Sequence, residues 1–269
     1  MAQMKTPGVY IIEKNAFPNS VVEVATAIPA FIGHTQFARD GNKDLTGIPF
    51  RISSMAEFHS FFGFASTLRF GIRPEDSESE DTTNDINVLF PDGSCQLTLP
   101  KTFYALYYNM LLFYANGGGP CYIVSVGDYE HDFKSIDFTN ALLALKKEQE
   151  PTLVVVPEAV YMEEGDCYKV QTAALMHCGN DMKNRFAILD VFNGYKDENG
   201  AVIKSFRENI GSNFLAYCAS YYPWINTSIV TEKDITFYNI EKDSLEKLEE
   251  LILNEFSKKS GVTLSLIHI

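Results

Sequence analysis

Short aliphatic runs alternate with helical stretches along most of this chain, and that alternation limits the fold more than any other feature. Four runs have the length of buried strands: residues 27–33, 121–126, 153–156 and 185–191. Four amphipathic or largely apolar stretches predict helices: residues 103–116, 138–148, 168–178 and 206–217. Helices placed between short buried strands are typical of a parallel sheet covered by helices. We therefore expect an α/β fold with a mixed, partly parallel sheet and flanking helices.

Two further segments carry signals for helix ends. Ser54 is followed three residues later by Glu57, which is the spacing of a capping box, and Gly63 is placed to end that helix. Residues 244–259 place leucine, isoleucine and phenylalanine at helical spacing, and Asp243 is the expected N-cap residue. Both segments are therefore predicted to be helices with defined starts.

The beginning of the chain contains a strand with no obvious partner nearby. Residues 9–12 are strand formers, and both faces of this strand are apolar. A single strand is not stable alone, and the turn-rich residues 15–20 separate it from the next strand. We expect an extended N-terminal β-strand arm that joins a sheet of the same subunit or of another one. The expected subunit-interface residues are Pro7, Gly8, Val9, Tyr10, Ile11, Ile12 and Glu13.

Three regions are expected along the chain. Residues 1–20 form the arm and its linker, and residues 21–225 form an α/β body. The body is interrupted near residues 74–98 by an acidic insertion, which we interpret as a solvated loop or disordered segment. Residues 37–49 are rich in turn formers and are expected to be a loop. Residues 226–269 form a separate segment that contains the last predicted helix.

Charge and cysteine content exclude several classes of function. The net charge of −13 argues against non-specific nucleic-acid binding and against an anionic membrane surface as a partner. The five cysteines include no C-x-x-C pair, and their odd number fits a reducing compartment. Residues 1–20 lack the pattern of a signal peptide, and the apolar run at 103–115 is too short to span a bilayer. We expect a soluble cytoplasmic protein without membrane insertion.

Glycines and a strand-end carboxylate are the first candidates for chemistry. The sequence NGGGP at residues 116–120 follows a predicted helix and opens a strand, whereas a phosphate loop follows a strand and opens a helix. We interpret it as a tight exit from the helix. Asp190 ends a predicted strand, where α/β proteins often place a functional carboxylate. A strand-end cap or structural ion pair is the plainer interpretation of Asp190, and Arg185 is expected to pair with Asp181.

The remaining motifs do not build an active site. His177-Cys178 and Asp166-Cys167 match no zinc spacing. The aromatic residues 217–224 favour a core or subunit contact over a ligand site. We therefore expect no catalytic, cofactor-binding or metal-binding residues, and so an assembly protein rather than an enzyme. The alternative is an α/β enzyme that binds a nucleotide or another small molecule, with Asp190 at its site.

Seven segments along residues 6–225 resemble, in the same order, the sheath proteins of contractile phage tails and of related bacterial contractile injection systems. They are TPGVYIIE at 6–13, AIPAFIG at 27–33, FFG at 61–63, NGGGPCYIVSV at 116–126, LVVVPEA at 153–159, KNRFAILDV at 183–191 and YCASYYPWI at 217–225. Each segment alone is weakly diagnostic, and their shared order makes the resemblance specific.

The resemblance implies a mechanical role without a cofactor. Sheath subunits of this kind form hexameric rings that stack helically around an inner tube protein on a baseplate, and terminal arms add strands to neighbouring subunits. Contraction drives the tube through a target envelope. By this resemblance, residues 7–13 are the arm and residues 15–20 its flexible link. Assembly would take place in a bacterial cytoplasm, and the product would be a phage tail, as part of a virion, or an injection particle.

The C-terminal part departs from the resemblance. After residue 225 the family continues into a region that completes a domain and supplies partner strands, and its glycine-, proline- and arginine-rich segments are not found in residues 226–269. The chain instead closes with a predicted strand at residues 262–269. We expect a truncated sheath subunit that offers an arm but lacks the strands that receive one.

Overall fold

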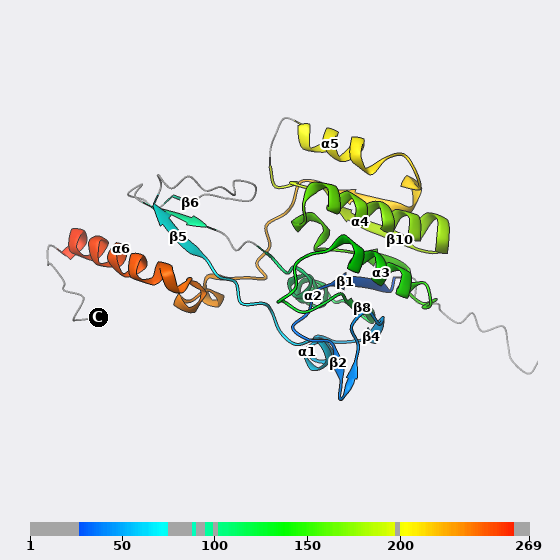
Figure 1. The fold of residues 1–269 in the computed structure, drawn as a ribbon, viewed down its shortest axis with the longest axis horizontal. Helices are drawn as coiled ribbons and strands as arrows, with labels where there is room; N and C mark the ends of the chain where they lie inside the picture. Colours follow the sequence, from blue (N-terminus) through cyan, green and yellow to red (C-terminus); the bar gives the residue numbers. More distant parts are fainter. Residues whose placement is uncertain (1–26, 75–87, 90–94, 99–101, 197–199, 261–269) are drawn as a thin grey trace, which may run out of the picture.

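The main body is one mixed sheet covered by helices. A computed structural model describes residues 27–74, 88–89, 95–98, 102–196 and 200–260. Within them, a six-stranded sheet has the order β11-β10-β9-β1-β8-β4 (Figure 1). The strands are β1 (Pro29–Gly33), β4 (Phe50–Ile52), β8 (Cys121–Ser125), β9 (Leu153–Val155), β10 (Phe186–Asp190) and β11 (Cys218–Tyr221). All neighbouring pairs are parallel except β4 with β8. The expected α/β fold is confirmed.

Helices cover both faces of this sheet. The α-helices of the described chain are α1 (Met55–Phe62), α2 (Leu106–Ala115), α3 (Ser135–Leu145), α4 (Glu164–Met176), α5 (Ala201–Ile210) and α6 (Lys242–Ser260). One buried cluster joins β1, β8, β9 and β10 to α3, α4 and α5, and a second joins β1, β4 and β8 to α1 and α2. The body therefore has three layers, with the sheet in the middle.

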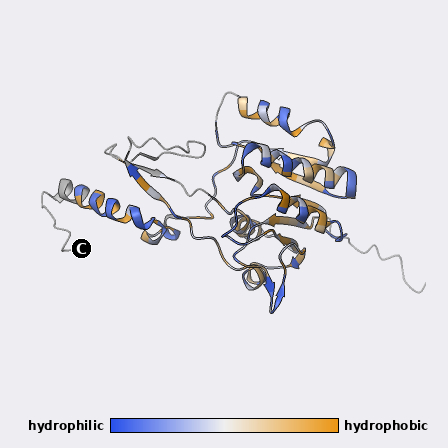
Figure 2. Ribbon diagram, viewed as in Figure 1, coloured by the Kyte–Doolittle hydropathy of each residue, from blue (hydrophilic) through white to orange (hydrophobic). Residues whose placement is uncertain are grey.

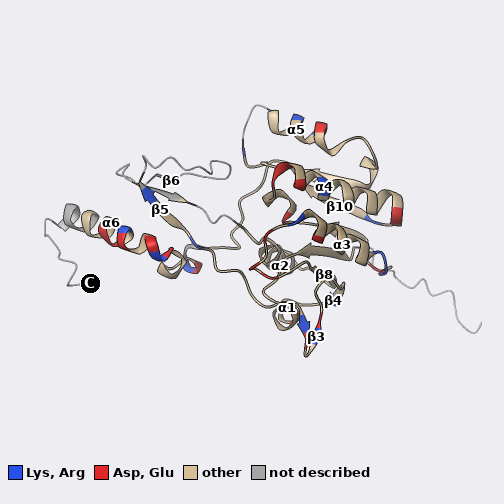
Figure 3. Cartoon of the chain, viewed as in Figure 1, with Lys and Arg blue, Asp and Glu red and all other residues tan. Residues whose placement is uncertain are grey.

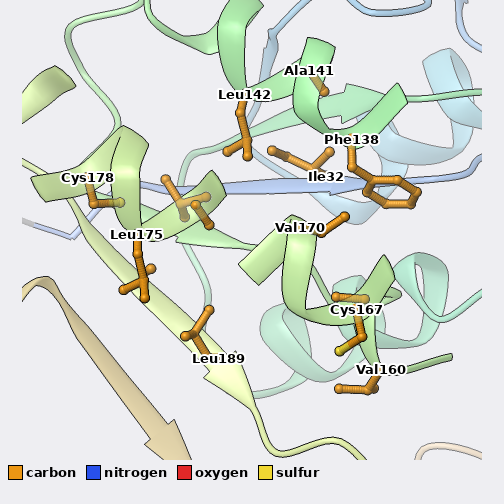
Figure 4. Packing of buried hydrophobic residues seen from close by; sticks show 14 of the residues in the cluster. Ile32, Phe138, Ala141, Leu142, Val160, Cys167, Val170, Leu175, Cys178 and Leu189 are labelled. Carbon is orange, nitrogen blue, oxygen red and sulfur yellow. The ribbon is translucent and has the colours of Figure 1, made fainter. Parts of the chain in front are cut away.

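The central strand β1 explains this layering. All five of its residues are buried. Because side chains alternate across a strand, Ala30 and Ile32 enter the first cluster while Phe31 enters the second. Figure 4 shows Ile32 close to Phe138 of α3 in the first cluster. Figure 2 shows the main-sheet strands as mostly hydrophobic, which is the pattern expected of a sheet buried on both faces.

Two smaller sheets lie outside this body. β2 (Arg39–Asp40) and β3 (Lys43–Asp44) form a short antiparallel hairpin. β5 (Gly71–Pro74), β7 (Cys95–Thr98) and β6 (Val88–Leu89) form an antiparallel sheet, and α6 lies beside β5, to one side of the body (Figure 1). The Ile72 amide donates to the Ser244 hydroxyl of α6 at 2.9 Å, which joins these two elements. Acidic residues are prominent along α6 (Figure 3).

Several predicted element boundaries are wrong. The helix expected at 206–217 is α5, which ends at Ile210, because Gly211 adopts a φ of 77° that other residues disfavour. Asp243 is not the N-cap of α6, since that helix begins at Lys242 and holds Asp243 in its first turn. The loop expected at 37–49 contains the β2–β3 hairpin, whose short strands carry no hydrophobic signal.

Ser54 is confirmed as the N-cap residue of α1, whereas the predicted capping box is not formed. Ser54 accepts a hydrogen bond from the Glu57 amide at 3.3 Å, as a capping residue should. The Glu57 carboxylate does not return to Ser54 but accepts from the amide of Ser53 at 2.7 Å. Gly63 ends the helix with a φ of 84°. No helix among the described residues is long and apolar enough to cross a membrane.

The N-terminal arm (Pro7, Gly8, Val9, Tyr10, Ile11, Ile12 and Glu13), its link and the predicted strand at 262–269 lie outside the described residues. So does most of the acidic insertion, in which β6 and β7 are described.

Candidate functional site

A hollow lies where the strands β10 and β11 end. It has a volume of about 650 Å³, and we call it the strand-end pocket. Its wall combines residues before and within α2, the short helical turn Ala159–Tyr161, the end of β10, and the segment after β11. The residues used below are Phe103, Tyr108, Tyr161, Asp190, Trp224 and Ile225. In α/β sheets the carboxyl ends of parallel strands commonly form ligand sites, so this hollow is the candidate site.

Asp190 is the charged residue of the strand-end pocket. It is the last residue of β10, and its backbone carbonyl accepts a hydrogen bond from the Gln171 side chain at 2.8 Å. The residue keeps exposed surface, yet the protein atoms around it raise the pKa of its carboxyl above the ordinary value. Within the described chain, no side chain or backbone amide donates to this carboxylate. The expected strand-end cap or ion pair is therefore not formed by Asp190.

Aromatic rings form the wall next to this carboxylate. The ring centroids of Tyr161 and Trp224 are 5.9 Å apart, and those of Phe103 and Tyr161 are 5.0 Å apart. Phe103 also stacks on Tyr108, with 5.4 Å between centroids. Burial, with the charge of Asp190 as a further cause, raises the pKa of Tyr161 to about 12. The Tyr161 hydroxyl is therefore neutral at physiological pH.

Trp224 is held in place by backbone contacts. Its indole Nε1 donates to the Val191 carbonyl at 2.9 Å, and its amide donates to the Gly194 carbonyl at 3.0 Å. A Cβ atom at Gly194 would lie 2.5 Å from the indole ring, so glycine is needed there for Trp224 to pack. These contacts hold the Trp224 ring in a fixed position in the pocket wall.

A second polar cluster lies deeper, between β1, β9 and α2. The Glu158 carboxylate accepts from the His34 amide at 2.9 Å and from the Leu106 amide at 3.2 Å. The His34 ring Nδ1 lies 2.8 Å from the same carboxylate. Both side chains are almost completely buried. Burial raises the pKa of Glu158, and the hydrogen bonds from His34 and Leu106 oppose that rise. Because solvent does not reach this pair, its role is to join β1, β9 and the start of α2.

Sequence reasoning missed Glu158, His34 and Tyr161. Glu158 and His34 each follow closely on the end of a buried strand, which is the same signal that singled out Asp190. The position of a polar residue at or soon after the end of a buried strand is therefore a signal that the sequence carries for Asp190, Glu158 and His34. Tyr161 gave no signal, because its place depends on the short helical turn after β9.

Other sequence-predicted residues have structural roles. Arg185 does not pair with Asp181, which instead lies 2.6 Å from Lys146. Arg185 is buried, and it donates to the carbonyls of Leu145 and Glu148 and to the His177 ring. The Arg185–Asp181 prediction is therefore wrong, because the guanidinium points inward to helix-end carbonyls.

The glycine and cysteine candidates lie apart from the strand-end pocket. After α2, Gly117 adopts a φ of 80° and the chain continues into β8, as the interpretation of a tight helix exit requires. His177 and Cys178 lie in the turn that follows α4, and Cys167 lies within α4. Within the described chain, no three His, Cys, Asp or Glu side chains lie close enough to hold a metal ion.

Comparison with known proteins adds no identification. No protein-family model matches the chain, and no curated protein matches it.

Proposed function

We propose that this chain is a structural subunit of a contractile tail sheath, which surrounds an inner tube and shortens to drive it through a target envelope. The ordered resemblance of seven segments supports this proposal. Five of the segments correspond to strands β1, β8, β9, β10 and β11, so the resemblance covers the parallel part of one sheet. Its partners would be other sheath subunits in stacked rings, the tube protein and the baseplate.

The observation that carries the proposal is the open edge at β11. This strand is at the end of the sheet order and pairs only with β10 among the described strands. Two large side chains at and just after its end lie in solvent: Tyr221, the last residue of β11, is 61% exposed, and Ile225 is 80% exposed. Natural proteins cover such edges or use them for pairing with another chain. An edge of this kind favours a protein that is buried in an assembly.

The predicted arm supplies the complementary half of such a contact. A strand that adds to a sheet edge gains backbone hydrogen bonds, each contributing about 0.5–1.5 kcal/mol net. Rings and stacks make many of these contacts at once, so weak single contacts can hold a lattice that still deforms.

Deletion of residues 1–14 tests the proposal. We expect circular dichroism to show a folded body, and electron microscopy of cells that also express the tube and baseplate to show no sheaths. Ile225→Asp should also reduce assembly, whereas Leu143→Asp, a matched change at an exposed site on α3, should not. Sheaths of normal length from the deletion variant would contradict the proposed arm.

A small-molecule-binding α/β enzyme is the second candidate. The observation in its favour is the strand-end pocket itself, whose volume of about 650 Å³ lies within the usual range of ligand sites, about 300–1,000 Å³. Thermal-shift measurements with nucleotides and other metabolites discriminate between the two candidates, because a ligand that binds only the native state raises the unfolding midpoint. A clear rise with a nucleotide would favour the enzyme.

A further inference from the structure

The strand-end pocket combines one unpartnered negative charge with several aromatic faces. Among its described lining residues Asp190 is the charged one, and none is a lysine, arginine or histidine. Asp190 is exposed at this wall, and no side chain or backbone amide of the described chain donates to its carboxylate. The carboxylate is therefore free to pair with a cation or a hydrogen-bond donor that enters the pocket.

The aromatic wall of the pocket favours a ligand with a positive charge. The face of an aromatic ring carries negative electrostatic potential and attracts a cation within about 6 Å of the ring centroid. Tyr161 and Trp224 line the same pocket as Asp190, and the charge of Asp190 acts on Tyr161. A second carboxylate, that of Asp234, acts electrostatically on Tyr108 at another part of the wall. All of these groups favour a cation and disfavour a phosphate or another anion.

The shape and chemistry of the wall favour an organic cation over a metal ion. A metal needs several oxygen, nitrogen or sulfur ligands, and the pocket places one carboxylate among rings and aliphatic side chains. An arginine side chain fits better, because its planar guanidinium can stack on an aromatic face and at the same time form bidentate hydrogen bonds to a carboxylate.

The edge strand next to the pocket indicates that the cation belongs to a polypeptide. Tyr221 is both the last residue of β11 and part of the pocket wall. A polypeptide that pairs with the open edge of β11 would pass the mouth of the pocket and could place a side chain in it. The net charge of −13 on this chain also favours a basic partner.

We infer that the strand-end pocket binds an arginine side chain of a partner polypeptide, with Asp190 as its counter-charge and Tyr161 and Trp224 as its stacking faces. This binding is a property of the single chain. It therefore goes beyond the sheath proposal and can hold or fail independently of assembly.

The chain contains a single tryptophan, Trp224, and this gives a direct readout. The experiment titrates the full chain with acetyl-glycyl-arginyl-glycinamide and follows Trp224 fluorescence. The matched probe replaces arginine by citrulline, which has nearly the same shape and no charge. We expect a saturable change with the arginine peptide and none with the citrulline peptide over the same concentrations. Equal binding of the two peptides, or no saturable change with either, would overturn the inference.

Two variants and one alternative ligand complete the test. Asp190→Asn should weaken arginine binding at least about tenfold, as expected for loss of a charge-assisted contact. Asp40→Asn makes the same change on the β2–β3 hairpin, outside the pocket, and should leave binding unchanged. Added salt should weaken binding to the unmodified chain, which keeps the test valid if Asp190→Asn does not fold. Undiminished binding by a folded Asp190→Asn variant, or tighter binding of choline than of the arginine peptide, would overturn the assignment.

Discussion

Replacement of Glu158 by alanine should cause a large loss of stability, although the residue touches no solvent and no proposed ligand. Its carboxylate accepts three hydrogen bonds, from the amides of His34 and Leu106 and from the His34 ring at 2.8–3.2 Å. Alanine would leave these three donors buried without an acceptor. Each unsatisfied buried group costs about 1–3 kcal/mol. Removal of one member of a buried pair typically costs about 3–5 kcal/mol. We therefore expect the free energy of unfolding to fall by about 4 kcal/mol.

Urea unfolding followed by circular dichroism measures this loss. With a urea dependence of about 3 kcal/mol per molar, the midpoint should fall by roughly 1–1.5 M. Glu158→Gln keeps one acceptor oxygen and should lose less than the alanine variant. Glu208→Ala is the matched control, because the Glu208 carboxylate is largely exposed and 3.9 Å from Lys204. The control should change the free energy by no more than about 0.5 kcal/mol.

The refuting result is a Glu158→Ala midpoint within about 0.2 M of the control, which is below 1 kcal/mol at the same urea dependence. That outcome would mean that the chain near β1 and α2 rearranges and gives the three donors new partners.

Two further changes test other buried contacts. Burial, followed by the positive charge of Arg185, lowers the pKa of His177 to about 4, so the unfolded chain binds a proton between about pH 6.5 and pH 4 that the folded chain does not. Stability should therefore fall on acidification across this window, by up to about 3 kcal/mol, and urea midpoints measured from pH 7 to pH 4.5 should fall less steeply in His177→Gln. Gly33→Ala should cost about 1–3 kcal/mol, because its Cβ would lie 2.9 Å from the Leu106 Cβ. Gly119→Ala, where no atom lies within 4 Å of the new Cβ, is the control, and equal urea midpoints for the two glycine variants would contradict the close approach.

The layered fold could be predicted because the signal is local. Each of β1, β8, β9 and β10 is a short aliphatic run that needs burial on both faces, and only helices on each side of the sheet can provide it. The peripheral strands could not be predicted in this way. β4 and β11 have partly exposed residues, and their strand character comes from pairing with a neighbour rather than from their own sequence.

The candidate site was only partly predictable. The position of Asp190 at the end of a strand marks it as a candidate, and the aromatic stretch that contains Trp224 predicts a core or subunit contact. The sequence does not show that these two residues line the same pocket, because their shared location depends on the parallel pairing of β10 with β11. The inward direction of Arg185 was equally hidden, since it depends on where the carbonyls at the end of α3 lie.

The position of β1 has a consequence for how the chain is made. Ala30 pairs with Tyr122 on one side and with Val154 on the other, so the first strand of the sheet becomes its centre. During synthesis this apolar strand leaves the ribosome long before either neighbour exists. The strands that pair with β1 come far later in the chain, so the contact order of the main sheet is high. Pairing across such long loops is slow, and until it is complete the exposed strand can pair with the wrong partner. Expression of this chain should depend on chaperones that shield residues 29–33 until β9 has been translated.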